Sequence, residues 1–232
     1  MKAAILSEFI TSKSDIVQSC ALYAVIAGVF AVIMGPAAAL AAVGAMMPFV
    51  LMFTFCSLDD VNGWARFRAS LPMSRSMLVQ SRYANILLGT GGMLVVAYLV
   101  VSLIGAALGM IVPGSDMAAS FSDELADGGA LVAAGVSGAC VTLFVCGCTL
   151  PFVLRCGMTK AMRIVPLVLT GAVFALFLAL ERIPAAAHAL AGVASWIDSH
   201  GLLAMAVFAL VVLVLYAASC ALACAMYRSK EF

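Results

Sequence analysis

The chain has 232 residues, of which 66% are apolar and 10% are charged, and its mean hydropathy is +1.19. A soluble domain is about 45–50% apolar and about 25% charged, so this composition excludes an ordinary soluble globular fold. Twelve Lys and Arg residues against eleven Asp and Glu residues give a formal net charge of +1, and we expect no nucleic-acid partner.

Six apolar runs are long enough to cross the hydrocarbon layer, which takes about 20 residues of helix. They cover roughly residues 17–34, 37–58, 84–112, 129–154, 164–183 and 201–226. None has the alternating pattern that is typical of barrel strands. We therefore predict an all-α integral membrane protein, with six transmembrane helices in a single domain spanning residues 1–232. Gly35 and Pro36 predict a tight hairpin between the first two spans.

Residues 1–15 precede the first span and mix charged with apolar side chains. Ile5, Phe9 and Ile10 fall near one helical face, which is typical of an amphipathic helix on the membrane surface. A frayed polar N-terminus is the alternative. We predict the surface helix.

The basic residues indicate how the spans are oriented. If the N-terminus is cytoplasmic, eleven of the twelve Lys and Arg residues lie inside and only Arg182 lies outside. Short loops rich in Lys and Arg stay in the cytoplasm, so the partition favours six spans with both termini cytoplasmic. An odd number of spans would break this partition. We expect a multi-pass protein of the plasma membrane.

Chemically reactive side chains form no convincing cluster in the sequence. Cys146 with Cys148, and Cys220 with Cys224, lack the further ligands of a zinc site, so we predict that the cysteines pack as small apolar side chains. His188 lies far from any Cys or carboxylate cluster. No Asp, Glu, Lys, Arg or His occupies the middle of a predicted span, which disfavours a proton- or sodium-coupled carrier. We expect no metal and no cofactor in this chain.

The sequence holds no motif of nucleotide hydrolysis or of covalent catalysis. Nothing in the sequence matches GxxxxGK[ST], and no Ser-His, Cys-His or HExxH arrangement occurs. We therefore predict that the chain is not an enzyme. Any transport that it performs must take its energy from a partner.

Residues 64–83 carry four arginines and no acid, between two long apolar runs. Pro72 and Ser74 suit the start of a helix, because Pro and Ser are favoured at the first positions. The segment predicts a short amphipathic helix parallel to the membrane, running from about Ser74 into the third span. We also expect Trp64 and Tyr83 to lie at the membrane interface.

The segment DDVNGWARFRASLPMSRSMLVQSRY, residues 59–83, resembles the signature loop of small ATP-binding-cassette permeases of the type-2 exporter class. The matching positions are Asp59 or Asp60, Trp64, Leu71, Pro72, Ser74, Arg75, Val79, Arg82 and Tyr83. The resemblance implies a half-transporter that forms a homodimer, or a heterodimer with a sister permease. It implies two copies of a separate cassette ATPase, which hold the ATP and magnesium and dock on the coupling loop, residues 59–83.

Arginines that follow a span also anchor topology and hold lipid phosphates, so this role stays open for Arg75 and Arg82. The ordered Trp, LPMSR and Tyr elements favour the coupling role, whereas for the basic loop 155–163 we favour the anchor. The acidic segment 113–129 is predicted to be a solvated external loop, and the resemblance implies re-entrant or surface helices at 183–198.

Small residues at several helix positions predict close helix packing. They are Gly105 and Gly109 in the third span, and Gly135, Gly138 and Ala139 in the fourth.

Taken with the resemblance, the sequence predicts the permease subunit of an ATP-driven exporter of a hydrophobic or amphipathic substrate, such as a peptide, lipid or drug. One alternative is a six-span sensor or immunity protein that binds a membrane-active peptide without transport. A second is a secondary carrier.

Overall fold

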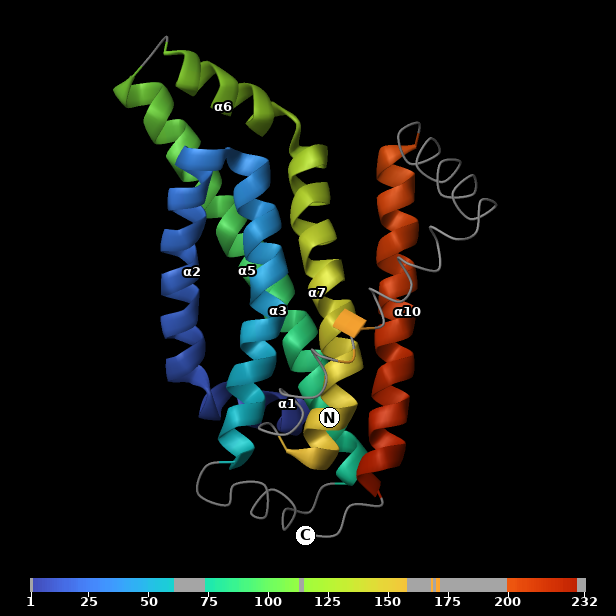
Figure 1. Ribbon diagram of the computed structural model, residues 1–232. Helices are drawn as coiled ribbons and strands as arrows, with labels where there is room; N and C mark the ends of the chain where they lie inside the picture. The colour runs from blue at the N-terminus through green and yellow to red at the C-terminus, as the bar shows by residue number, and fades with distance from the viewer. Residues whose placement is uncertain are drawn as a thin grey trace.

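The computed structural model in Figure 1 describes residues 2–60, 74–112, 115–157, 168, 170–171 and 200–228. Its helices are α1 (Lys2–Thr11), α2 (Lys13–Met34), α3 (Pro36–Asp60), α5 (Arg75–Ile111), α6 (Asp116–Ala126), α7 (Gly128–Cys156) and α10 (Gly201–Arg228). No strand occurs in these ranges, so the all-α prediction is confirmed for them.

Five of the helices are long and apolar enough to cross a membrane. They are α2, α3, α5, α7 and α10, and they correspond to five of the six predicted spans. The remaining predicted span, 164–183, which is the fifth in chain order, and the segment 183–198 lie outside the described residues, apart from residues 168 and 170–171. The prediction of six spans therefore stays a prediction.

Helix α3 occupies the centre of the bundle and packs against α2, α5 and α7, while α10 packs against α7 and α5 (Figure 1). Helices α7 and α10 both begin at the end of the bundle that holds α6 and run toward the end that holds α1 (Figure 1). The two helices consequently run in the same direction. The end of α7 and the start of α10 lie at opposite ends of the bundle.

The hairpin between α2 and α3 is as tight as the sequence predicts. Gly35 alone separates the helices and has φ of +95°, a left-handed conformation that glycine adopts without steric cost. Pro36 is the first residue of α3, where its missing N–H removes no intrahelical hydrogen bond. Glu124 of α6 accepts a hydrogen bond of 3.3 Å from the Ala37 N–H, placing a carboxylate at the start of α3.

Helix α6 corrects the prediction of a solvated loop at 113–129. Ser115 caps it by accepting a hydrogen bond of 3.1 Å from the Ala118 N–H. Phe121 is buried against Ala31, Ala39 and Val101, although the neighbouring acidic side chains are exposed. A four-residue spacing of Phe121 and Leu125 gives the segment one apolar helical face, and that face covers the α2–α3 hairpin and α5.

The predicted close packing at Gly135, Gly138 and Ala139 is confirmed between α7 and α3. A Cβ on Gly44 would overlap the Gly135 carbonyl oxygen, and one on Gly138 would overlap the Ala41 carbonyl oxygen. Gly105 instead accommodates Leu125 of α6. Gly109 has open space around its Cα, so its predicted packing role is absent from this structure.

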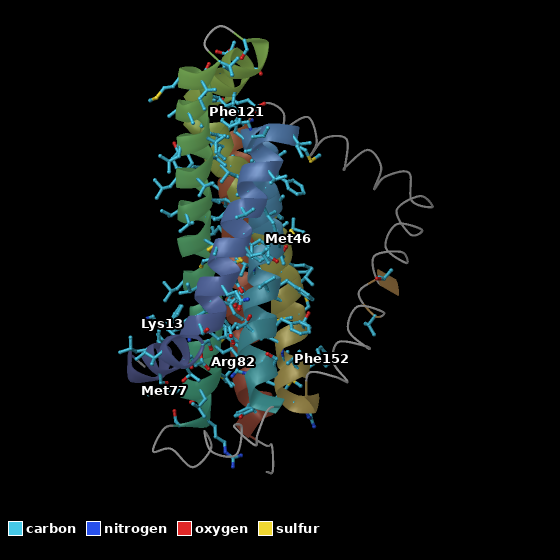
Figure 2. All side chains as sticks on the ribbon, turned by 90° about the vertical axis from the view of Figure 1, so that its left-hand side faces the viewer. Lys13, Met46, Met77, Arg82, Phe121 and Phe152 are labelled. Atoms are coloured by element: carbon cyan, nitrogen blue, oxygen red, sulfur yellow. The ribbon has the colours of Figure 1, made fainter. Side chains whose placement is uncertain are left out.

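Helix α1 lies across the long helices at one end of the bundle, and Figure 2 shows it beside Lys13 and Met77. The predicted helix is present, but its predicted apolar face is divided. Ile10 is 64% exposed, whereas the Phe9 ring packs edge-on against Phe55 of α3 with centroids 6.1 Å apart. Glu8, which precedes Phe9, turns into the bundle, where it is 7% exposed.

The two ends of the bundle differ in charge. The end that holds α1 and the start of α5 carries every Lys and Arg of the described ranges: Lys2, Lys13, Arg75, Arg82, Arg155 and Arg228. The opposite end carries α6 with Asp116, Asp123 and Glu124, followed by Asp127. We call the first of these the basic end.

Candidate coupling site

Helix α5 begins at the basic end with a defined cap. Ser74 has an extended backbone, and its hydroxyl accepts a hydrogen bond of 3.3 Å from the Met77 N–H. This confirms the prediction that Ser74 caps a helix. Arg75, the first residue of α5, is exposed.

The predicted short surface helix is wrong in one respect. Residues 75–83 are the first turns of α5, a continuous helix of 37 residues, and do not form a separate element. Apolar side chains at the start of α5 are the reason, because they enter the bundle at once. Val79 is 1% exposed and packs in the main core with Phe55 and Leu150.

The second half of the motif is also buried, against expectation. Arg82 is 2% exposed and Tyr83 is 3% exposed, so neither lies on the surface that Arg75 presents. A topology anchor or an interfacial tyrosine would keep its polar end at the membrane surface. Both residues instead bind other helices of the same chain.

Arg82 is held by polar partners from two other helices. Its Nη2 lies 3.5 Å from Oε1 of Glu8 in α1, and its Nη1 lies 3.7 Å from Sγ of Cys56 in α3. Asn85, one turn further along α5, donates a hydrogen bond of 2.5 Å from Nδ2 to Oε2 of Glu8. Figure 2 places Arg82 among the helices at the basic end. Removing one partner of such a buried pair typically costs about 3–5 kcal/mol.

Tyr83 joins three helices through a chain of hydrogen bonds. The Ser219 hydroxyl of α10 donates a bond of 2.5 Å to the Gly147 carbonyl of α7, so Tyr83 donates its own hydroxyl to Ser219 at 2.9 Å. The Tyr216 hydroxyl returns from α10 to the Tyr83 carbonyl at 3.2 Å. The two tyrosine rings lie 4.9 Å apart. This network fixes the start of α5 to α7 and α10.

The first half of the predicted loop lies mostly outside the described residues. Asp60 is the last residue of α3, and Asp59, the alternative for the same motif position, precedes it. Trp64, Leu71 and Pro72 lie outside the described residues. Their roles in coupling stay predictions, as does that of Asp60.

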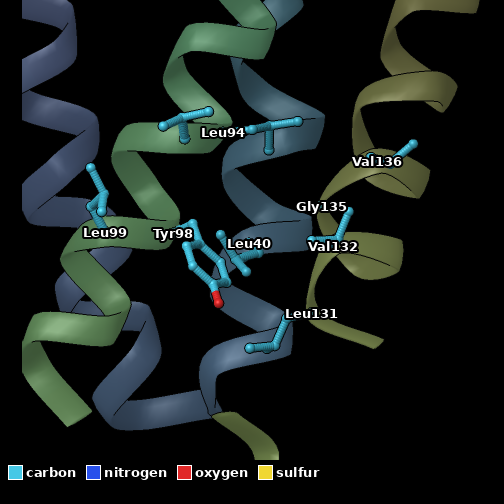
Figure 3. Close-up of a pocket in the computed structure, with 9 residues that line it drawn as sticks. Leu40, Leu94, Tyr98, Leu99, Leu131, Val132, Gly135 and Val136 are labelled. Atoms are coloured by element: carbon cyan, nitrogen blue, oxygen red, sulfur yellow. The ribbon is translucent and has the colours of Figure 1, made fainter. Parts of the chain in front are cut away.

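An apolar crevice of about 270 Å³ opens between α5 and α7 (Figure 3). Leu40 of α3 lies at its back, and side chains of α5 and α7 face each other across it. Its lining is Leu40, Leu94, Val95, Tyr98, Leu99, Leu131, Val132, Gly135 and Val136. A second cavity, of about 280 Å³, lies between α7 and α10.

The cysteines, the possible metal ligands and the exposed start of α5 show what chemistry the described residues can support. The cysteines of this part of the chain are unbridged and buried or half-buried, and several lie in the main core with Tyr83 and Tyr216. Across the described ranges no three Cys, His, Asp or Glu side chains come together as metal ligands would. The basic end exposes the capped start of α5, where Arg75 is the first helical residue.

A family model described as "ABC-2 family transporter protein" matches residues 4–228. The chain therefore belongs to the ABC-2 transporter family, and it is a multi-pass membrane protein of the permease type. Permeases of this family are membrane transport components that associate with an ATPase subunit. No curated protein and no solved structure matched the chain.

Sequence reasoning missed Glu8, Asn85, Cys56 and Ser219 as partners of the motif. One signal was available: Arg82 and Asn85 are three residues apart, which puts two polar side chains on one face of an apolar helix. Such a face requires a polar partner, and Glu8 is the acid of the N-terminal helix.

Proposed function

We propose that this chain is the membrane subunit of an ATP-driven exporter, and that a separate cassette ATPase docks at its basic end. The observation that carries this proposal is the family match over residues 4–228. ATP and magnesium bind to the ATPase, and the present chain converts its movement into transport.

Docking through the start of α5 is supported by what that helix exposes. Ser74 and Arg75 are accessible at the basic end, and both belong to the segment 59–83 that resembles the family's coupling loop. A guanidinium there can bind a carboxylate or backbone carbonyls of the ATPase. Since α5 continues for 37 residues, about 55 Å at 1.5 Å per residue, a displacement of Arg75 can be transmitted to the far end of the bundle.

Six spans, with both termini in the cytoplasm of a plasma-membrane protein, belong to the same proposal. The sorting of Lys and Arg to one end supports the orientation. Because α7 and α10 run in the same direction, a return from the basic end to the opposite end lies between the end of α7 and the start of α10. That return supports a further crossing.

A hydrophobic or amphipathic substrate, such as a peptide, lipid or drug, is supported by the walls of the crevice between α5 and α7, which are apolar apart from the Tyr98 hydroxyl. Large apolar side chains on α2, α5 and α10 are exposed, among them Val25, Val95 and Leu210. These faces are available to lipid and to a second permease. We propose a homodimer or a heterodimer with a sister permease, served by two ATPase copies.

Purification from the native membrane tests the proposal. The chain should carry a cassette ATPase with it, and the complex in lipid vesicles should hydrolyse ATP faster when the substrate is added. A chain that retains no ATPase under mild solubilisation contradicts the proposal and favours a six-span sensor or immunity protein.

A further inference from the structure

A buried charge pair links α1 to the start of α5. The side chains of Arg82 and Glu8 are 3% and 7% exposed, and Nη2 of Arg82 lies 3.5 Å from Oε1 of Glu8. Asn85 binds the second carboxylate oxygen of Glu8 at 2.5 Å and reaches the Ile5 carbonyl of α1 at 3.5 Å. One carboxylate therefore holds two successive turns of α5.

The same pair lies beside both stems of the segment 61–73. Cys56, which Nη1 of Arg82 contacts at 3.7 Å, is in the last turns of α3 before that segment begins. Arg82 is in the first turns of α5 after the segment ends. The packing of Phe9 on Phe55 adds an apolar contact between α1 and the α3 stem.

Burial makes this connection difficult to open. When two paired charges are separated inside a medium of low dielectric constant, each loses its attraction to the other. Neither is compensated by hydration, because water does not reach it. Separating α1 from α5 would leave both Glu8 and Arg82 in that state. The end of α3, the start of α5 and α1 are therefore expected to move as one body.

We propose that Glu8 is a positioning residue for coupling: through Arg82 and Asn85 it holds α1 on the two stems of the 61–73 segment, so that α1 moves with α5 when the ATPase acts. This role rests on the proposed function. Glu8 is buried, whereas Ser74 and Arg75 are exposed, so the docking surface and the element that transmits the movement use different residues.

The first measurement uses the full-length permease alone, in lipid nanodiscs. Glu8→Gln removes the charge and keeps the shape, and it should speed amide hydrogen exchange in α1 by about tenfold or more because α1 then opens locally. The matched control is Asp15→Asn, which neutralises an exposed acid at the start of α2 and should leave exchange in α1 unchanged. Unchanged exchange in Glu8→Gln would overturn the proposal.

The second measurement adds the ATPase. Glu8→Gln should lower substrate-stimulated hydrolysis by about tenfold while the Kd for the ATPase changes by less than about twofold, since an interaction that acts only during turnover leaves binding intact. Exchanging the charges, Glu8→Arg with Arg82→Glu, should restore the stimulation. If the exchanged pair does not fold, Glu8→Asp, which keeps the charge but shortens its reach, should give intermediate stimulation.

The two proposals fail in different arms of this experiment. Full stimulation in Glu8→Gln with α1 loosened would overturn the role of Glu8 and leave the proposed function intact. A wild-type chain that binds no ATPase would overturn the proposed function, and with it the coupling role, whatever Glu8→Gln does.

Discussion

The hydroxyl of Thr142 in α7 donates a hydrogen bond of 2.5 Å to the carbonyl oxygen of Ala45 in α3. Only a close approach of the two backbones allows this bond, and Gly44 and Gly138 provide that approach. Within a membrane, helices associate through packing and interhelical hydrogen bonds, because lipid tails are as apolar as the side chains themselves. This seam is therefore the structural centre of the bundle.

Replacing Gly44 with Ala should destabilise the chain, because the new methyl group meets the Gly135 carbonyl oxygen. Overpacking of this kind typically costs about 1–3 kcal/mol. The thermal unfolding midpoint in detergent should fall for Gly44→Ala. The matched control is Gly109→Ala, where no atom of another helix lies within 4 Å of the added Cβ, and its midpoint should not fall. Equal midpoints for Gly44→Ala and the wild type would contradict the seam.

Tyr83→Phe should remove the hydrogen bond between α5 and Ser219 of α10 without leaving a cavity. The expected loss of stability is about 0.5–1.5 kcal/mol, since one buried hydrogen bond is lost while the aromatic packing on Tyr216 remains. The control is Tyr98→Phe, which should change the stability little because Tyr98 is 37% exposed. Unfolding of both variants in the same detergent measures the two losses of stability. An equal loss in both variants would argue against the network.

Reporter fusions test the orientation of the chain. Fusions after Lys230 and within 64–83 should report cytoplasm, and fusions near Asp123 and Ser195 should report the outside, as the sorting of eleven basic residues to one side predicts. Enzymatic reporters that are active on only one side of the membrane make the measurement. A cytoplasmic signal at Asp123 would exclude the six-span arrangement.

Local signals in the sequence predicted the helices well. Apolar runs gave the five described spans, Gly35 with Pro36 gave the hairpin, and Ser74 gave the start of α5. Each of these depends on the residues at that place in the chain. The family resemblance likewise came from a contiguous motif, and the family match over residues 4–228 confirms it.

The partners of the motif could not be predicted in the same way. Whether Arg82 faces the lipid surface or Glu8 depends on where α1 lies, and no local pattern encodes that position. The same holds for Tyr83, whose partner Ser219 is 136 residues away. The acids and turn signals of segment 113–129 predict a loop, although Phe121 and Leu125 supply the apolar face of α6 that packs on α5.

The affinity of the cassette ATPase for the permease, measured with the double variant Ser74→Ala and Arg75→Ala, tests the central claim most directly. Loss of the cap costs about 1 kcal/mol of helix stability, and truncating an interfacial charge costs about 2–5 kcal/mol of binding. The account predicts normal insertion, binding weakened by about 30-fold or more, and reduced substrate-stimulated hydrolysis. The control Arg155→Ala, an exposed arginine in the last turn of α7, should bind as the wild type does. A double variant that inserts normally, binds the ATPase with wild-type affinity and supports full hydrolysis would contradict the account and leave Arg75 as a topology anchor.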